Sequence, residues 1–197
     1  MKKIFSLFIV ATLVFAAMAL SVNAEIVVAN PSELSVGGEI NKLSGNMYGY
    51  YEYDFANTDL IIDLNGYTWT SDDVVLKIIN GNVTVYDSSP NKTGKIESSA
   101  NDAVTISNGS LYIKDITVVA NGGGMDAIFV DGGNVIVENC VLSAEKACID
   151  ASNASEAGGA PANISVNGGK FANYAAPGNR CRAIELRNSG TEGPRVT

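Results

Sequence analysis

The chain has 197 residues, of which 46% are hydrophobic and 17% are charged, and its formal net charge is −8. This composition is that of a globular protein rather than a disordered one, and the length suits one domain with a substantial core. The acidic balance argues against a nucleic-acid partner, and the absence of histidine excludes every Ser-His-Asp or Cys-His catalytic arrangement and every histidine-ligated metal.

Residues 1–24 read as a secretory signal peptide. Lys2 and Lys3 form a basic start, an apolar run follows, and residues 22–24 supply the compact residues of a cleavage site after Ala24. The alternative is an N-terminal membrane anchor, for which the apolar run is short. No later apolar stretch is long enough to span a membrane. We therefore expect a secreted or bacterial cell-surface protein with no membrane span in its mature chain.

Residues 25–56 are expected to form a short N-terminal cap. This segment ends in an aromatic cluster made of Tyr48, Tyr50, Tyr51, Tyr53 and Phe55. We expect the cluster to cover the first rung of the domain that follows. The alternative is that Tyr51 and Tyr53 form a substrate-binding platform, because aromatic rings stack on the apolar faces of sugars.

Residues 57–197 contain a repeated apolar pattern, in which two short alternating runs are joined by one extra residue. The copies begin at Ile62, Val83, Leu111, Val135 and Ile164. Alternation predicts a strand with one buried face, and the extra residue reverses the phase, so the chain must bend there. The bend positions hold Gly66, Asp87, Asp115, Asn139 and Gly168, all of which tolerate turn or left-handed conformations.

A further short strand precedes most copies. Its inward residues form the series Leu76, Val104, Ile128, Ile149 and Ile184. Each unit therefore has three short strands, and the units lack helical periodicity. Together these features predict an all-β fold, a parallel β-helix of about five coils. An antiparallel β-sandwich is the alternative, but it does not predict bend residues at a recurring offset.

The segments 60–67, 81–87 and 109–115 resemble the opening coils of secreted bacterial right-handed β-helix proteins of the pectate-lyase-like superfamily. The resemblance covers about residues 57–190. It implies a right-handed helix, and the general handedness of parallel crossovers agrees with it. The superfamily includes polysaccharide lyases, glycoside hydrolases, adhesins and passive surface repeats, so the resemblance implies the fold and not the activity.

Outward positions of the first strand in each coil are the candidate site. One column contains Phe129, Asp150 and Glu185, and the next contains Asp131 and Arg187. Neighbouring rungs lie about 4.8 Å apart, so these side chains are expected to gather on one face. Two carboxylates could act on a glycosidic bond, with Phe129 contacting the sugar. The resemblance to the superfamily also implies a lyase alternative, in which the acids would hold Ca²⁺ and Arg187 would remove a proton.

The sequence has none of the dense acidic clusters or short catalytic motifs of these enzymes. The competing interpretation of this column is a solvated polar face without a cofactor. A register slip of one residue would also scatter the candidate residues.

Three cysteines follow Asn139. Cys140 falls in an inward column and is expected to be buried. Cys148 and Cys181 lie one coil apart at the start of the first strand, and they are a candidate disulfide bridging adjacent rungs.

The last coil begins near Ile184 without an obvious closing segment, so the solenoid of residues 57–197 is expected to be incomplete at its C-terminus. The repeat-rich, motif-poor sequence favours a non-catalytic module, adhesin-like or glycan-binding, whose partner is a carbohydrate or another surface protein. The alternative is a polysaccharide lyase or glycoside hydrolase that uses Asp150 and Glu185.

Overall fold

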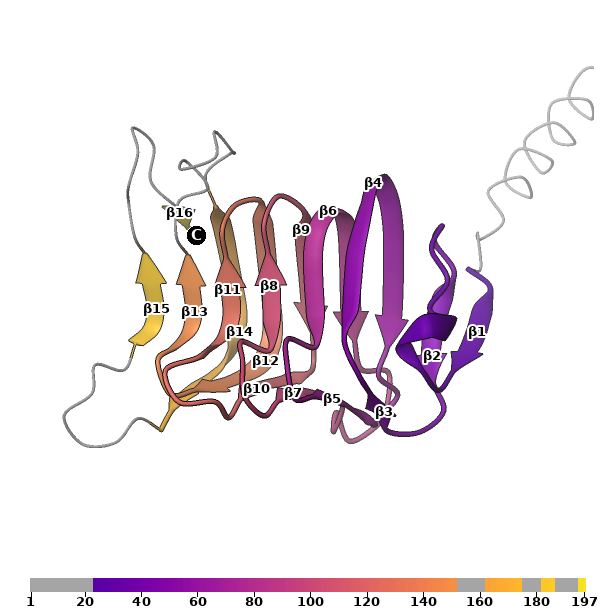
Figure 1. Cartoon of the computed structure of the whole chain (residues 1–197), viewed down its shortest axis with the longest axis horizontal. Helices are drawn as coiled ribbons and strands as arrows, with labels where there is room; N and C mark the ends of the chain where they lie inside the picture. Colours follow the sequence, from indigo (N-terminus) through magenta and orange to yellow (C-terminus); the bar gives the residue numbers. More distant parts are fainter. Residues whose placement is uncertain (1–22, 152–161, 175–181, 187–194) are drawn as a thin grey trace, which may run out of the picture.

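A computed structural model describes residues 23–151, 162–174, 182–186 and 195–197. These residues form a parallel β-solenoid of about five turns, as the sequence predicts. Figure 1 shows the coils stacked along the long axis, from β1 at one end to β15 at the other. Each coil has three sides, which we call the first, second and third faces in chain order.

The first face begins with residues 51–54 of β4 (Tyr51–Asp63) and residues 76–80 of β6 (Leu76–Tyr86). It continues through β8 (Val104–Ile106), β11 (Asp126–Val130), β13 (Ala147–Ala151) and β15 (Arg182–Leu186). All neighbours on this face pair in parallel, and the predicted inward ladder from Leu76 to Ile184 is confirmed at every step.

The second face contains the later halves of β4 and β6, followed by β9 (Ser110–Lys114) and the first halves of β12 (Asn134–Ala144) and β14 (Asn163–Asn173). It also includes β1 (Glu25–Val28) and β2 (Ile40–Leu43) at one end and β16 (Arg195–Val196) at the other. Residues 25–43 thus extend the same parallel stack.

The third face consists of β3 (Met47–Tyr48), β5 (Thr68–Ser71), β7 (Lys95–Ser98), β10 (Thr117–Ala120) and the second halves of β12 and β14. A 3₁₀ turn at Pro31–Glu33 lies between β1 and β2. In the part of the chain that the structure describes, no helix is long and apolar enough to cross a membrane.

One inward ladder differs from its prediction at the first coil. Val83 pairs with Leu60, and Ile62 pairs with Val85, so the first coil is shifted by one inward position. The reason is a longer bend in that coil, where Asn65 and Gly66 both adopt positive φ values. The remaining members of the ladder pair as predicted.

The bends between the second and third faces have the backbone that their residue types favour. Asp115, Asn139 and Gly168 have φ values of 56°, 52° and 75°. A left-handed residue turns the chain sharply from one face to the next, which a straight strand cannot do. The bend residue thus connects the strand on the second face to the strand on the third face in each of these coils.

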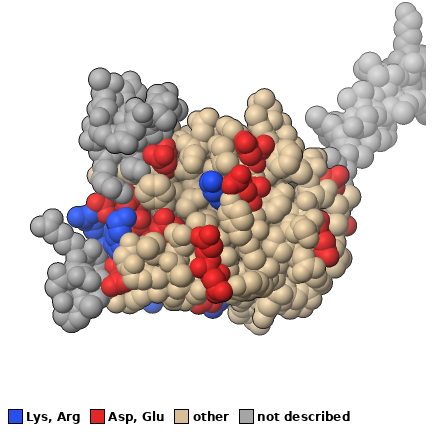
Figure 2. Space-filling view, in the orientation of Figure 1, with Lys and Arg blue, Asp and Glu red and all other residues tan. Residues whose placement is uncertain are grey.

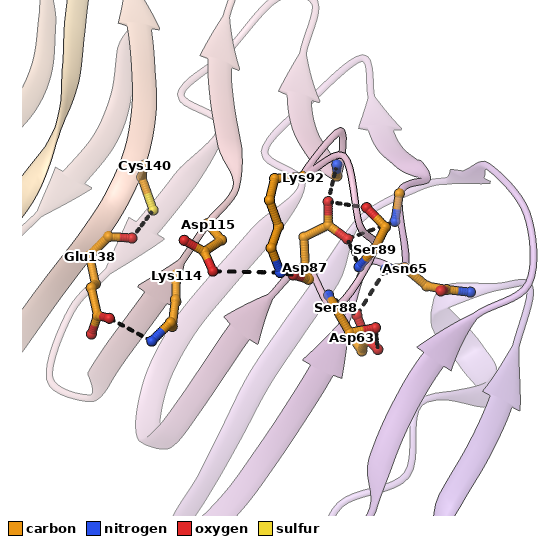
Figure 3. Close-up of polar contacts among 12 residues, drawn as sticks. Asp63, Asn65, Asp87, Ser88, Ser89, Lys92, Lys114, Asp115, Glu138 and Cys140 are labelled. Atoms are coloured by element: carbon orange, nitrogen blue, oxygen red, sulfur yellow. Dashed lines mark hydrogen bonds and ion pairs between the residues drawn. The ribbon is translucent and has the colours of Figure 1, made fainter.

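A buried carboxylate, Asp87, organises the bend that carries the excursion of residues 88–94 (Figure 3). It accepts hydrogen bonds from the backbone N–H groups of Gly66, Ser89 and Gly94, and from the Ser89 hydroxyl. Burial works to raise the pKa of Asp87, but these hydrogen bonds outweigh it and lower the pKa. The excursion is thus held at both ends by one side chain.

Candidate functional site

The outward column of the first face is in the predicted register. Phe129 pairs with Asp150, and Asp150 pairs with Glu185 in the next coil. Asp131 follows Val130 at the end of β11, where its N–H donates to the carbonyl of Ile106. Arg187 lies outside the described residues. The structure therefore brings together Phe129, Asp150 and Glu185, with Asp131 one position beyond the strand.

The environment of Asp150 differs from that of a solvent-facing catalytic acid. Its side chain is fully buried, and its Oδ2 lies 2.7 Å from the ammonium group of Lys146. The same ammonium lies 2.7 Å from Oδ2 of Asp126, which is also buried. One lysine therefore bridges two buried carboxylates, and we call these three residues the acid–lysine cluster.

Burial dominates the electrostatics of this cluster. It raises the pKa of Asp126 to about 6, helped by the negative charges of Asp150 and Asp102 and opposed by Lys146. Burial acts to lower the pKa of Lys146, but its two carboxylate partners together raise it. Asp102 accepts the backbone N–H of Asp126 at 2.7 Å, and burial raises its pKa as well.

Glu185, the second predicted carboxylate, forms an ion pair with Arg182 from its own strand. Figure 2 shows basic and acidic side chains gathered where Figure 1 places β13 and β15. An acid–base pair acting on a glycosidic bond needs two carboxyl groups that reach the sugar. Asp150 does not reach the surface in this arrangement, and both predicted acids already have a cationic partner.

The predicted aromatic platform is also rearranged. Tyr53 is fully buried and packs against Phe55 with ring centroids 5.4 Å apart, so its face is not open to a sugar. Tyr51 and Phe129 are only partly exposed. The exposed rings near the N-terminal end are Tyr48, Tyr50 and Phe55. Alternation alone could not separate these sets, because β4 bends after Tyr53.

A second candidate site lies at the turns from the first face to the second, which form the upper edge of the stack in Figure 1. Two columns of polar side chains flank these turns. One column is Asp54, Asn80 and Asn108, and the other is Asp59, Asn82, Ser110, Asn134 and Asn163. We call the space between them the amide groove. Sequence reasoning missed it because the asparagines resemble ordinary turn residues.

Amide hydrogen bonds link each column along the stack. Asn80 donates to Asp54 at 2.6 Å, and Asn108 donates to Asn80 at 3.3 Å. In the other column, Asn82 donates to Asp59 at 3.0 Å, and Asn134 donates to Ser110 at 3.5 Å. The walls are therefore ordered by contacts between coils rather than by contacts within one turn.

Glycines form the floor of the groove because the turn backbones approach closely. A Cβ on Gly81 would lie 2.3 Å from the carbonyl oxygen of Phe55, and a Cβ on Gly133 would lie 2.1 Å from that of Gly109. Any larger residue would push the coils apart. The result is an open cavity of about 230 Å³ lined by small and amide side chains, including Ala56, Asn57 and Ser110.

Within residues 23–151, 162–174, 182–186 and 195–197, no group of three His, Cys, Asp or Glu side chains is placed to hold a metal ion.

The cysteines lie where the repeat places them. Cys140 is buried as predicted, and its thiol contacts the carbonyl of Glu138 at 3.3 Å. Cys148 is also buried, with its Sγ 3.3 Å from the carbonyl of Leu142. Cys181 lies outside the described residues, so the Cys148–Cys181 disulfide stays a prediction.

The sequence matches no protein-family profile and no curated protein, and no solved structure matches the chain.

Proposed function

We propose that this protein is a secreted or cell-surface β-helix module that binds glycans without cleaving them. The amide groove carries the proposal, because it is a polar surface repeated from coil to coil and lined by groups suited to hydroxyls. A signal peptide ending at Ala24 and a place in the pectate-lyase-like superfamily belong to the same proposal.

The chemistry of the groove supports binding rather than catalysis. Its lining residues are asparagine, serine, glycine and alanine, none of which titrates near neutral pH. An asparagine amide offers both donors and an acceptor, so it can pair with a sugar hydroxyl in either sense. Each hydrogen bond to a sugar replaces one to water, so a single contact adds little to the affinity. A row of such contacts is therefore needed for useful affinity.

The acid–lysine cluster also supports binding rather than catalysis. Asp150 is buried and shares Lys146 with Asp126, so its carboxylate has the environment of a structural ion pair. Asp126 has a raised pKa of about 6, as a general acid often has, but its side chain is buried beneath the same lysine.

The experiment combines a glycan array with a degradation assay on the purified protein. The degradation arm follows reducing ends and the absorbance of unsaturated products, with and without Ca²⁺. We expect binding without cleavage. The double variant Asn82→Ala, Asn108→Ala removes two wall amides and should weaken binding about tenfold or more.

Asn121→Ala is the matched control, because Asn121 is exposed on a different edge and donates to Glu97 at 2.7 Å. It should bind as the unmodified chain does. Circular dichroism establishes that all variants keep the fold. Cleavage lost in Asp150→Asn would overturn the proposal in favour of an enzyme, and the absence of binding to any glycan would overturn it outright.

A further inference from the structure

We propose that the amide groove takes a neutral, unbranched polysaccharide whose chain runs parallel to the solenoid axis across several coils. This inference rests on the proposed glycan-binding function and adds the charge class of the ligand and its direction. Neither follows from glycan binding alone, since a sugar could also lie across the coils or carry uronate groups.

The direction follows from how the walls are built. Asp59, Asn82 and Ser110 occupy equivalent positions in successive coils, and the parallel register continues through Asn134 and Asn163. The groove is thus elongated along the stack, with equivalent groups repeated about every 4.8 Å. This repeat is comparable to the length of one pyranose ring, so successive sugars of an extended chain meet successive rungs.

The hydrogen-bonding capacity of the walls fits hydroxyl groups. Asn82 uses one amide N–H for Asp59, and Asn108 uses one for Asn80. Each amide has two N–H groups, so a second donor remains on each side chain. Sugar hydroxyls both donate and accept, and they can bind such amides without a charge on either partner.

The charge distribution disfavours an acidic polysaccharide. The groove is lined by uncharged residues, and the carboxylates of Asp54 and Asp59 stand at its N-terminal end as hydrogen-bond acceptors for the wall amides. Uronate groups in this groove would meet like charge without a lysine or arginine among its lining residues.

The floor fits the same ligand. In the turns of residues 80–82 and 108–110, only Gly81 and Gly109 lie between the two walls, so these turns place no side chain on the floor. A linear chain can lie along this floor and reach both columns. A branch at each sugar would instead collide with the wall amides, which are fixed to their neighbours by hydrogen bonds.

The test uses soluble β-1,4-linked glucose, mannose and galactose oligosaccharides, each from disaccharide to octasaccharide, and oligogalacturonates of the same lengths. Binding to the whole purified protein is measured by calorimetry. We expect affinity for at least one neutral series to rise about tenfold or more from the shortest to the longest chain, because each added sugar engages another rung. We expect the oligogalacturonates to bind at least about tenfold more weakly.

Two lysine variants make the charge argument specific. Asn82→Lys places a cation in the wall, and it should lower affinity for the neutral chain while raising affinity for the oligogalacturonate. Asn121→Lys adds the same charge on another edge and should change neither by more than about twofold. Both variants are compared with the unmodified chain by circular dichroism.

The possible outcomes distinguish failure of this inference from failure of the proposed glycan-binding function. Preference for oligogalacturonates, or affinity for the neutral chains that is independent of their length, overturns this inference and leaves the glycan-binding function standing. Binding confined to branched glycans in the array has the same meaning. Absence of binding to all oligosaccharides and to the whole array overturns the proposed function, and this inference with it.

Discussion

The ammonium group of Lys146 lies 2.7 Å from Oδ2 of Asp150, four residues further along the chain. Lys146 precedes β13 and Asp150 lies within it. The lysine side chain therefore lies over the outward side of the strand that it precedes. The same ammonium reaches Asp126 in the preceding coil. Sequence alternation places Asp150 at an outward position, exposed to solvent. In the structure Lys146 contacts it there, and the Asp150 side chain is buried.

Lys146→Met tests the structural role of this cluster. At neutral pH the substitution keeps the aliphatic stem but leaves two buried carboxylates without their cation. Breaking a buried pair costs about 3–5 kcal/mol, and the partial exposure of Lys146 reduces this to about 2–3 kcal/mol of unfolding free energy. Urea denaturation measures the loss. Lys77→Met is the control, since its pair with Glu52 is exposed to solvent and its loss should lower the unfolding free energy far less.

The raised pKa of Asp126 predicts a pH dependence with a definite sign. The carboxyl has a pKa of about 6 in the folded chain and about 3.9 when unfolded, so the folded state binds more protons between these values. This contribution is complete below the unfolded pKa and is lost as the pH rises through the folded pKa. Burial of the Asp126 carboxyl is the largest cause of the raised pKa, Lys146 opposes it, and the charges of Asp150 and Asp102 add to it.

Comparison with Asp126→Asn isolates this effect, because Asp87 and other carboxylates with lowered pKa values act in the opposite direction. The unfolding free energy of the unmodified chain, taken relative to Asp126→Asn, should fall as the pH rises from about 4 to about 7. Urea titrations across this range measure the difference. A difference that rises or stays constant would contradict the shift.

Gly109→Ala tests the close packing of the groove floor. A Cβ at this position would lie 2.5 Å from Cγ2 of Ile78 and 2.8 Å from the carbonyl oxygen of Gly81. We expect a loss of about 1–3 kcal/mol in thermal or urea unfolding, typical of an overpacked site. Gly45→Ala is the matched control, because an added Cβ there has open space, and the variant should change stability by less than about 0.5 kcal/mol.

If Cys148 and Cys181 form the predicted disulfide, the denatured, unreduced protein should have one reactive thiol. Alkylation followed by peptide mass spectrometry should label Cys140 alone. After reduction, all three cysteines should be labelled. Labelling of Cys148 without reduction, in protein recovered from an oxidising compartment, would be evidence against the bridge.

Much of the fold was predictable because its signals are local and repeated. Alternation identified the strands, and bend residues such as Asp115 and Asn139 fixed where the phase reverses. The first coil was misplaced by one inward position, because Asn65 and Gly66 lengthen its bend in a way that apolar spacing does not reveal.

The candidate site was less predictable, since it depends on contacts between coils. The column of Phe129, Asp150 and Glu185 followed from register alone. The burial of Asp150 did not, because Lys146 reaches it from outside the repeating pattern. The amide groove was missed for a related reason. A single asparagine in a turn carries little information, and the groove wall is recognised only when contacts between coils, such as that of Asn108 with Asn80, are known.

The excursion anchored by Asp87 has a consequence for how such a chain can grow. Its carboxylate holds Ser89 at one end of the excursion and Gly94 at the other, and the strand pairings of β6 with β9 and of β7 with β10 lie outside these two residues. Within the excursion, Lys92 forms an ion pair with Asp115 of the next coil. Asp87 therefore closes the base of the excursion. New sequence can be inserted inside it, by evolution or by an engineer grafting an epitope, while the coils above and below keep their spacing.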